Sequence, residues 1–166
     1  MHVGLACLST TAAWRSGPSP DSEVFSLLHI PGAIPLSVSN RTLFFEATQL
    51  FRFRYDLSRR EWRCCTLAYS YSLAEDAQLA KECIAWHWHP GTSREPHVHV
   101  RTEHPALGRL ARLHLPTARV SFESVVRFLI GDLGVECRAG EGWSERLAEA
   151  EANWTGSGFR TSVPHP

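Results

Sequence analysis

The middle of the chain alternates between apolar and polar residues as strands do. From Leu50 to Tyr55 aromatic residues alternate with arginines, so one face of a strand would carry rings and the other guanidinium groups. The polar stretch 56–61 predicts a turn. We expect four strands, at about 48–56, 62–73, 82–89 and 97–101, forming an antiparallel meander within residues 42–101.

Beyond the meander the spacing of apolar residues becomes helical. Ser121 is a good N-cap, and Glu123 would lie in the first turn of a helix over 121–133. The apolar stripe of this helix consists of Phe122, Val125, Val126, Leu129, Ile130 and Leu133. A second amphipathic helix is expected at about 143–154. Strands followed by helices predict an α+β fold, with two C-terminal amphipathic helices packed on one face of an antiparallel sheet.

The length of 166 residues fits a single domain over residues 1–166. Residues 1–40 show the weakest pattern, which predicts a loop-rich N-terminal arm with one strand near residues 24–30. The helical part should cover residues 120–155.

Composition narrows the class of protein only a little. The formal net charge is zero, so no overall field favours nucleic acid or an anionic membrane. The five cysteines are odd in number and include no C-x-x-C pair, which favours reduced thiols over a disulfide framework. With no apolar run long enough for a membrane span, we expect a cytoplasmic protein.

The candidate chemistry lies in two H-x-H pairs that flank a turn bracketed by prolines. His87 and His89 would share one face of a strand, because side chains alternate along it, and His97 and His99 would share a face of the next strand. Pairing His89 with His97 would place all four imidazoles on one face of the sheet. The neighbouring tryptophans and valines would then lie on the core side.

Four gathered imidazoles allow three interpretations. They could serve as acid, base or phosphate-binding groups near neutral pH. They could bind a divalent metal such as zinc, with all four as ligands. They could also form a merely solvated, polar sheet face. Carboxylates that could orient the rings are Glu95, Glu103 and Asp76.

A more specific metal motif also passes through this hairpin. Gly91, His97, His99 and Glu103 reproduce the spacing of the first metal-binding motif of the cupins. The second cupin motif has no counterpart downstream, where the chain turns helical. A cupin-like metal site nevertheless stays among the alternatives.

Arginines gather around the first hairpin of the meander. Arg52, Arg54, Arg59, Arg60 and Arg63 stand there against only Asp56 and Glu61. With interleaved aromatic residues, such a surface could hold the phosphates of a nucleic acid, and Arg52 and Arg54 are the candidate substrate-binding residues. A solvated turn is the simpler interpretation of the same charges.

Three stretches together resemble the TumE-like toxins of bacterial toxin–antitoxin pairs, over about residues 44–135. They are the aromatic and basic strand 51–55, the His-x-His strand 96–100, and the helix that opens with Ser-x-Glu within 120–129. The resemblance implies a small toxin neutralised by a helix-turn-helix antitoxin encoded beside it. The long N-terminal arm, the His87/His89 pair and the helix at 143–154 depart from that pattern.

The sequence therefore predicts a toxin-like protein that acts on nucleic acid or nucleotide. His97 and His99 are the expected active groups, supported by His87 and His89. The alternatives are a metal-binding protein and a non-enzymatic interaction module built on the tryptophan-rich sheet and the last helix.

Overall fold

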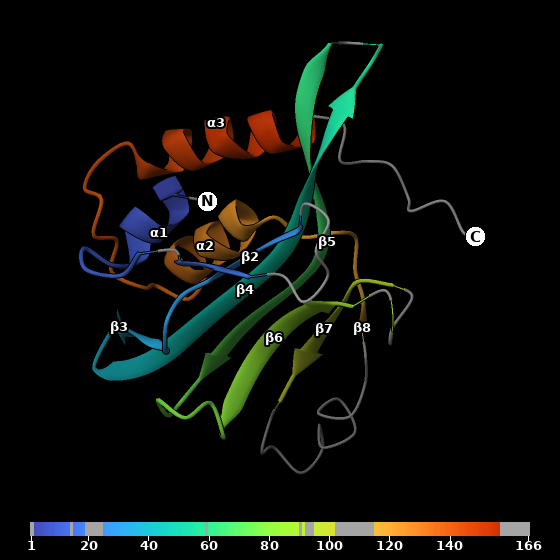
Figure 1. Cartoon of the computed structure of the whole chain (residues 1–166). Helices are drawn as coiled ribbons and strands as arrows, with labels where there is room; N and C mark the ends of the chain where they lie inside the picture. The colour runs from blue at the N-terminus through green and yellow to red at the C-terminus, as the bar shows by residue number, and fades with distance from the viewer. Residues whose placement is uncertain are drawn as a thin grey trace.

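The computed structural model describes residues 2–13, 15–18, 25–58, 60–89, 91, 95–101 and 115–156. Within these residues the chain forms one antiparallel sheet of eight strands and three helices (Figure 1). The elements are α1 (His2–Leu8), β1 (Arg15–Pro18), β2 (Phe25–His29), β3 (Ile34–Val38), β4 (Arg41–Asp56), β5 (Glu61–Ala74), β6 (Glu82–Trp88), β7 (His97–Val100), β8 (Leu115–Pro116), α2 (Phe122–Gly131) and α3 (Trp143–Gly156). This arrangement confirms the predicted α+β fold.

The strands lie in the order β1-β2-β4-β5-β6-β7-β8, and β3 also pairs with β4. The four predicted strands correspond to β4, β5, β6 and β7. Strand β4 begins seven positions earlier than predicted, at Arg41 rather than 48, because a tight turn through Ser39 folds β3 back onto it. Ser39 has a φ of +52°, a left-handed conformation typical of such turns. The far end of the β4–β5 hairpin extends away from the rest of the sheet (Figure 1).

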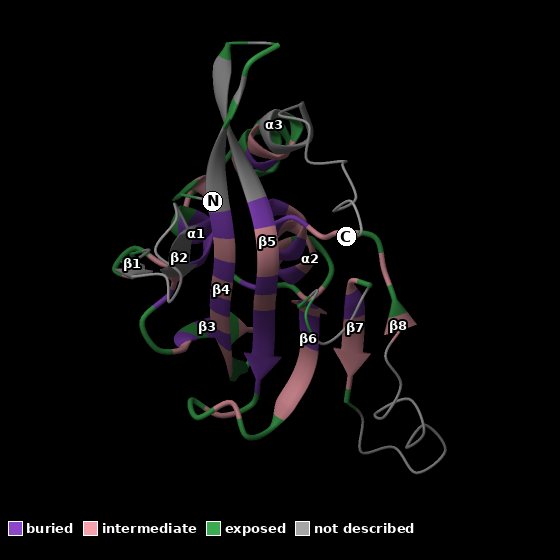
Figure 2. Ribbon diagram, turned by 45° about the vertical axis from the view of Figure 1, so that its right-hand side comes forward, coloured by how far each residue is buried: buried purple, intermediate pink, exposed green. Residues whose placement is uncertain are grey.

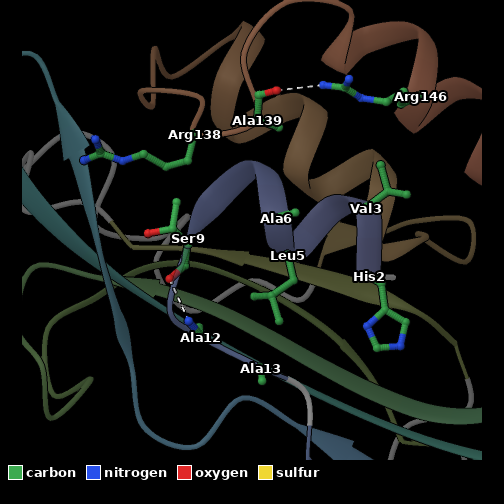
Figure 3. A pocket seen from close by; sticks show the side chains of 11 residues that line it. His2, Val3, Leu5, Ala6, Ser9, Ala12, Ala13, Arg138, Ala139 and Arg146 are labelled. Carbon is green, nitrogen blue, oxygen red and sulfur yellow. Dashed lines mark hydrogen bonds between the residues drawn. The ribbon is translucent and has the colours of Figure 1, made fainter.

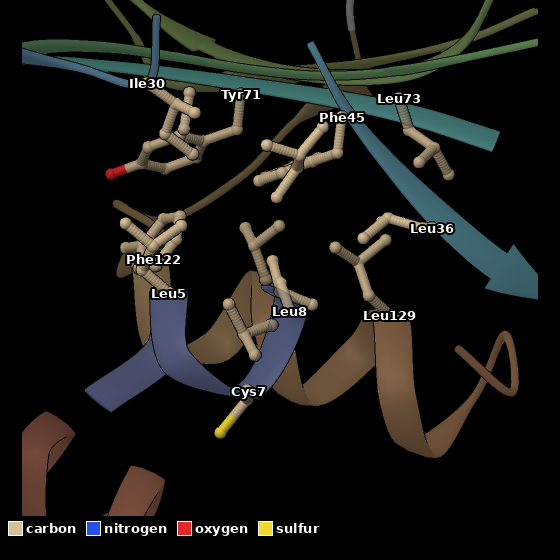
Figure 4. Close-up of a cluster of buried hydrophobic side chains, with 14 of the residues drawn as sticks. Leu5, Cys7, Leu8, Ile30, Leu36, Phe45, Tyr71, Leu73, Phe122 and Leu129 are labelled. Carbon is tan, nitrogen blue, oxygen red and sulfur yellow. The ribbon is translucent and has the colours of Figure 1, made fainter. Parts of the chain in front are cut away.

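One face of the sheet packs against the helices. Phe122 of α2 contacts two rings of the sheet, with centroids 6.2 Å from Phe45 and 5.8 Å from Tyr71. These rings meet Leu5 and Leu8 of α1 in a shared core (Figure 4). Aromatic residues supply much of the apolar area in this layer, and such burial is the main force that holds a sheet to its helices.

The helix-covered face is the predicted one. Trp86 lies edge-on to Phe128 of α2 with ring centroids 5.5 Å apart, Trp88 is buried, and Val98 packs against the same core. The prediction that helices cover Trp86, Trp88 and Val98 is therefore confirmed. Buried positions run along the central strands of the sheet (Figure 2).

Helix α2 begins and ends close to the predicted residues. The Ser121 hydroxyl accepts a hydrogen bond from the Ser124 amide at 3.0 Å, as an N-cap does. Glu151 of α3 accepts hydrogen bonds from the hydroxyls of both serines and pairs with Arg127. Burial alone would raise the pKa of Glu151, but these hydrogen bonds and the Arg127 charge outweigh it and hold the pKa below its usual range. The cap of α2 is thereby tied to α3.

The expectation of a loop-rich arm over residues 1–40 is wrong. This segment contributes α1, β1, β2 and β3, of which only a strand near residues 24–30 was predicted. Helix α1 has seven residues, about two turns, too few for the 3.6-residue periodicity to stand out. Its position depends on Gly4, where an added Cβ would lie 2.8 Å from the Phe122 ring.

The cysteines that the structure describes agree with the expectation of reduced thiols. Cys7, Cys83 and Cys137 are free, and Cys7 of α1 is buried. Burial, together with the neighbouring Cys137, raises the pKa of the Cys7 thiol to about 11. A thiol with so high a pKa is a poor nucleophile at neutral pH. The side chains of Cys64 and Cys65 lie outside the described residues.

Candidate functional site

The β6–β7 hairpin places three of the four predicted histidines on the sheet face opposite the helices. Antiparallel pairing sets His87 across from His97 and Ala85 across from His99, while Trp86 lies across from Val98. The predicted pairing of His89 with His97 is therefore wrong by two residues. A shift of two preserves the alternation of faces, so the predicted separation of imidazoles from tryptophans still holds.

The ladder between β6 and β7 ends where the turn begins. In the observed register the next pair would be Trp88 with Pro96, but proline has no N–H with which to continue the ladder. The last pair before the turn is therefore His87 with His97. His89 follows the end of β6, and its side chain is exposed.

The imidazoles form a compact group that we call the histidine cluster, comprising His87, His89, His97 and His99. Ring centroids are 4.9 Å apart for His97 and His99, 5.1 Å for His87 and His99, and 5.9 Å for His87 and His97. The ring of His89 lies 5.8 Å from that of His87. All three distances among His87, His97 and His99 are short, so these three rings form a triangle, and His89 lies beside its His87 corner.

The cluster is less exposed than a solvated strand face would be. His97 retains only 7% of its accessible surface, and His87 and His99 are half-buried. The interpretation as a merely solvated sheet face therefore does not fit His97. Sequence alternation assigns a side chain to a face of the sheet, but it does not show how tightly neighbouring side chains cover it.

Two of the rings have an oxygen partner that fixes their orientation. His97 Nδ1 lies 3.0 Å from the backbone carbonyl oxygen of Glu95. Since a carbonyl only accepts hydrogen bonds, Nδ1 must carry the proton, and in the neutral ring Nε2 then carries the lone pair. His87 Nδ1 lies 3.1 Å from the Ser70 hydroxyl of the neighbouring strand β5.

The environment keeps His87 uncharged at neutral pH. Burial lowers the pKa of His87 from 6.5 to about 4, and the positive charge that neighbouring imidazoles would carry adds to this effect. The carboxylate of Glu82 opposes the shift without overcoming it. A neutral imidazole offers a lone pair, but with so low a pKa His87 is a weak base at neutral pH.

Sequence reasoning missed Ser70 and Glu82, which lie around the cluster. Ser70 contacts His87, and Glu82 accepts a hydrogen bond from Ser72 at 3.4 Å. Glu82 also pairs with Arg101, with Nε and Oε1 3.3 Å apart. The alternation Tyr-Ser-Tyr-Ser at 69–72 signals that both serines share a face. The register that brings Ser70 beside His87 comes only from the assembled sheet.

Of the carboxylates proposed as ring orienters, Asp76 lies in a turn away from the rings. Glu95 contacts the cluster through its backbone carbonyl. The Asp76 carboxylate accepts hydrogen bonds from the backbone amides of residues 78, 80 and 81, so it closes the turn between β5 and β6. Glu103 lies outside the described residues, as do His104 and His114.

The metal interpretation requires several ligand nitrogens that converge on one ion. Among the residues that the structure describes, no group of three or more His, Cys, Asp or Glu side chains is arranged to hold a metal ion. The rings of the histidine cluster are close, but their nitrogens do not meet at one point. The described strands also form a single sheet, whereas cupins are jelly rolls of two packed sheets.

The candidate phosphate-binding residues lie apart from the cluster. Arg52 and Arg54 pair through their backbones with Cys65 and Arg63, and their side chains lie outside the described residues. Thr48 pairs with Ser70, which contacts His87, and Arg52 lies four positions beyond Thr48 along β4. At a rise of about 3.4 Å per residue, the Arg52 backbone is about 13 Å further along the sheet. The fold does not bring these arginines beside the histidines.

A pocket of about 670 Å³ lies elsewhere in the molecule, against α1 (Figure 3). Its walls include Leu5, Ala12, Arg138 and Arg146. Both guanidinium groups already have protein partners, since Arg138 pairs with Glu136 and Arg146 donates to the Ala139 carbonyl. The helices carry this pocket, whereas the histidine cluster occupies the opposite face of the sheet.

Comparison with protein-family models, with curated proteins and with solved structures finds no match to this chain. In the described part of the chain, no helix combines the length and the apolar character needed to cross a membrane. The proposed function therefore depends on the geometry of the histidine cluster.

Proposed function

We propose that this chain is a toxin-like component of a bacterial toxin–antitoxin pair and acts on nucleic acid or nucleotide through the histidine cluster. The observation that carries the proposal is the triangle of His87, His97 and His99, with ring centroids 4.9–5.9 Å apart. Imidazoles are the usual groups for moving protons at neutral pH, and a reaction on a phosphate ester needs such transfers.

The members of the cluster take different roles in this proposal. His87, kept neutral by its surroundings, supports the other histidines by offering a lone pair to a substrate hydroxyl. His97 is held by the Glu95 carbonyl and, with His99, is the group that exchanges a proton with a substrate in this proposal. His99 completes the triangle, and the exposed His89 stands where a substrate would enter. Arg52 and Arg54 could hold phosphates of a long substrate that spans the distance to β4.

The toxin role and its partner depend on the resemblance to TumE-like toxins. A toxin must be kept inactive in its own host, and a helix-turn-helix antitoxin that covers the histidine cluster would achieve this. Such an antitoxin should bring carboxylates against the arginines of the β4–β5 hairpin, because opposite charges speed encounter and discourage wrong partners. A cytoplasmic location follows from this role.

A growth assay tests the proposal. The full chain is expressed in a bacterial host, alone and together with the neighbouring helix-turn-helix gene, and RNA integrity and nucleotide pools are followed. We expect the chain alone to slow growth and the second gene to restore it. The double variant His97→Ala/His99→Ala should be harmless while keeping the circular dichroism spectrum of the wild type.

The matched control is His2→Ala, which removes an exposed histidine of α1 outside the cluster and should stay as toxic as the wild type. If the wild type is harmless at high expression, the toxin role is wrong. Equal toxicity of the wild type and the folded double variant would instead remove the histidines from the active site.

A further inference from the structure

We propose that Cys7 and Cys137 form a redox-sensitive pair, in which a peroxide oxidises Cys137 and Cys7 then closes a disulfide bond. The inference goes beyond the proposed function, since it concerns the helix layer and needs none of the histidines. The two cysteines are 130 positions apart in the sequence, and only the fold brings them together. In reducing compartments the disulfides that do occur are usually transient ones of this kind, which sense oxidants.

The backbone around Cys137 is held between two other elements. The amide of Glu136 donates a hydrogen bond to the Ser37 carbonyl of β3, with nitrogen and oxygen 3.0 Å apart. The amide of Arg138 donates to the Cys7 carbonyl of α1, at 2.8 Å. Cys137 lies between these two hydrogen bonds, so its backbone is fixed directly beside that of Cys7.

The thiol groups meet on the side of α1 that faces away from the sheet. The Cys7 sulfur points away from the apolar side chains that α1 packs against the sheet (Figure 4). The thiols of Cys7 and Cys137 lie close enough to form a hydrogen bond. A disulfide requires neighbouring backbones and side chains that face each other, because otherwise the chain has to move. This pair meets both requirements in the folded protein.

The surroundings give the two thiols different roles. Cys7 retains 0% of its accessible surface, whereas Cys137 is half-buried and can meet a small oxidant from solvent. Burial, with a smaller contribution from the Cys137 thiol, raises the pKa of Cys7 to about 11, so Cys7 by itself reacts slowly with a peroxide. Cys137 is therefore oxidised first, and Cys7 is the thiol that resolves the product.

The chemistry uses one molecule of hydrogen peroxide for each disulfide. The Cys137 thiolate attacks one peroxide oxygen and the O–O bond breaks, which gives a sulfenic acid and a hydroxide that takes up the proton released by Cys137. The Cys7 sulfur then attacks the sulfenic sulfur, the S–O bond breaks, and the leaving hydroxide takes the Cys7 proton. The two thiols lose two electrons in total, and the peroxide is reduced to two molecules of water.

The first oxidation favours the second step. A thiolate on Cys137 would repel a thiolate on Cys7, and this repulsion contributes to the high pKa of Cys7. The neutral sulfenic acid that replaces the Cys137 thiol lacks that charge, while the positive charge of Arg146 still lowers the pKa of Cys7. Burial remains the main cause of the high pKa. Attack is nonetheless effective, because the two sulfurs are already neighbours and the step is intramolecular.

The disulfide joins α1 to the segment between α2 and α3. Cross-links that close long loops remove the most conformational entropy from the unfolded chain, and this loop spans about 130 residues. The oxidised protein should therefore unfold at a temperature about 10 °C higher than the reduced protein. The bond also fixes α1 against Arg138 and Ala139, which line the same pocket as α1 (Figure 3).

The test follows the thiols of the full chain during oxidation. The reduced protein is treated with hydrogen peroxide, the remaining thiols are alkylated, and peptides are mapped by mass spectrometry without reduction. We expect a pair of peptides joined through Cys7 and Cys137. The midpoint of thermal unfolding should rise with the joined fraction and return to its original value when dithiothreitol is added. Dimedone, which traps sulfenic acids, should label little of the wild type, because Cys7 consumes the intermediate.

Three variants separate the roles of the thiols. In Cys7→Ala the sulfenic acid has no partner, so dimedone labelling of Cys137 should exceed that of the wild type by about 5-fold or more. In Cys137→Ser the midpoint should not rise, and Cys7 should stay reduced. Cys83→Ser is the matched control, because Cys83 is also free and half-buried, and it should form the disulfide as the wild type does. Cys7→Ala is interpreted only if its circular dichroism spectrum matches the wild type, and Cys137→Ser decides the question in any case.

The absence of a link between Cys7 and Cys137 in the oxidised, folded wild type would overturn the proposal. A link that forms only in urea would also overturn it, because the fold would then not be what pairs the thiols. A rise of the midpoint that persists in Cys137→Ser would assign the effect to other cysteines and have the same consequence. None of these outcomes bears on the growth assay, so the histidine cluster and the thiol pair are tested independently.

Discussion

The two faces of the β6–β7 hairpin have opposite tasks although their residues alternate along the same strands. On the helix side Trp86 and Trp88 keep only 8% and 2% of their exposure, and both pack into the aromatic core. On the other side His87, His97 and His99 face one another and the hydroxyl of Ser70. One strand thus contributes stability through every second residue and candidate chemistry through the residues between them.

The comparison also shows that the polar face is not a simple solvent surface. His97 is as buried as Trp86, at 7% against 8% exposure. A buried polar ring needs hydrogen-bond partners, and His97 has one in the Glu95 carbonyl. The histidine face is therefore ordered by hydrogen bonds, whereas the tryptophan face is ordered by packing.

The largest expected effect comes from comparing substitutions at two adjacent residues of β6, one on each face of the hairpin. Trp86→Ala should lower the free energy of unfolding by about 3–5 kcal/mol, because it empties a large space between β6 and α2. His87→Ala at pH 7 should lower it by about 1 kcal/mol or less, because this side chain is only half-buried. Urea denaturation of both variants measures the difference. Equal losses would mean that the histidine face is part of the core.

A smaller effect is expected where α1 meets α2 on the tryptophan side. In Gly4→Ala the new Cβ would lie 2.8 Å from the Phe122 ring and 3.3 Å from Val126 Cγ2. Overpacking of this kind costs about 1–3 kcal/mol, which outweighs the gain of about 1 kcal/mol in helix propensity. Thermal unfolding should show a lower midpoint for Gly4→Ala. Gly131→Ala, with no atom within 4 Å of its Cβ, is the control and should be neutral or stabilising.

The acid stability of the protein tests the histidine face of the β6–β7 hairpin. The pKa of His87 is about 4 in the folded chain and 6.5 ordinarily, so between these values the unfolded chain binds more protons. The free energy of unfolding should therefore be unaffected by His87 above about pH 6.5 and fall as the pH drops toward 4. Since the ring is partly solvated, we expect a loss of about 1–2 kcal/mol.

Urea denaturation at a series of pH values in EDTA measures this loss. His87→Ala should show a flatter pH dependence than the wild type between pH 6.5 and 4, whereas His2→Ala should follow the wild type. Identical slopes for the wild type and His87→Ala would show that the low pKa of His87 does not contribute to acid unfolding.

The smallest effect is expected at the end of the β4–β5 hairpin, which lies outside both faces of the β6–β7 hairpin. Leu57 is 83% exposed there. Leu57→Ser should change the free energy of unfolding by less than about 0.5 kcal/mol, as is usual for exposed positions. If a partner protein covers this hairpin, the same variant should weaken its binding in a pull-down while leaving the fold unchanged. A marked loss of stability would instead show that Leu57 packs against residues beyond the described part of the chain.

Local patterns in the sequence predicted much of the fold. Alternation assigned Trp86 to one face and His87 to the other, and the Ser121 cap with its apolar stripe predicted α2. These features depend on neighbours a few residues apart, so the order of residues is enough to specify them. Helix α1 was missed because its seven residues are too few to show the helical periodicity. Its position depends on Gly4, which lies close to the Phe122 ring of α2.

The sequence by itself determined that four histidines occur in two alternating pairs and that each pair occupies one face of its strand. Only the tertiary structure decided that His87 pairs with His97, that Ser70 lies beside His87, and that His97 is buried. A shift of two residues keeps every side chain on its face, so alternation cannot distinguish the two registers. The register is decided where β6 pairs with β5 and with β7, and these contacts form between segments that the sequence keeps apart.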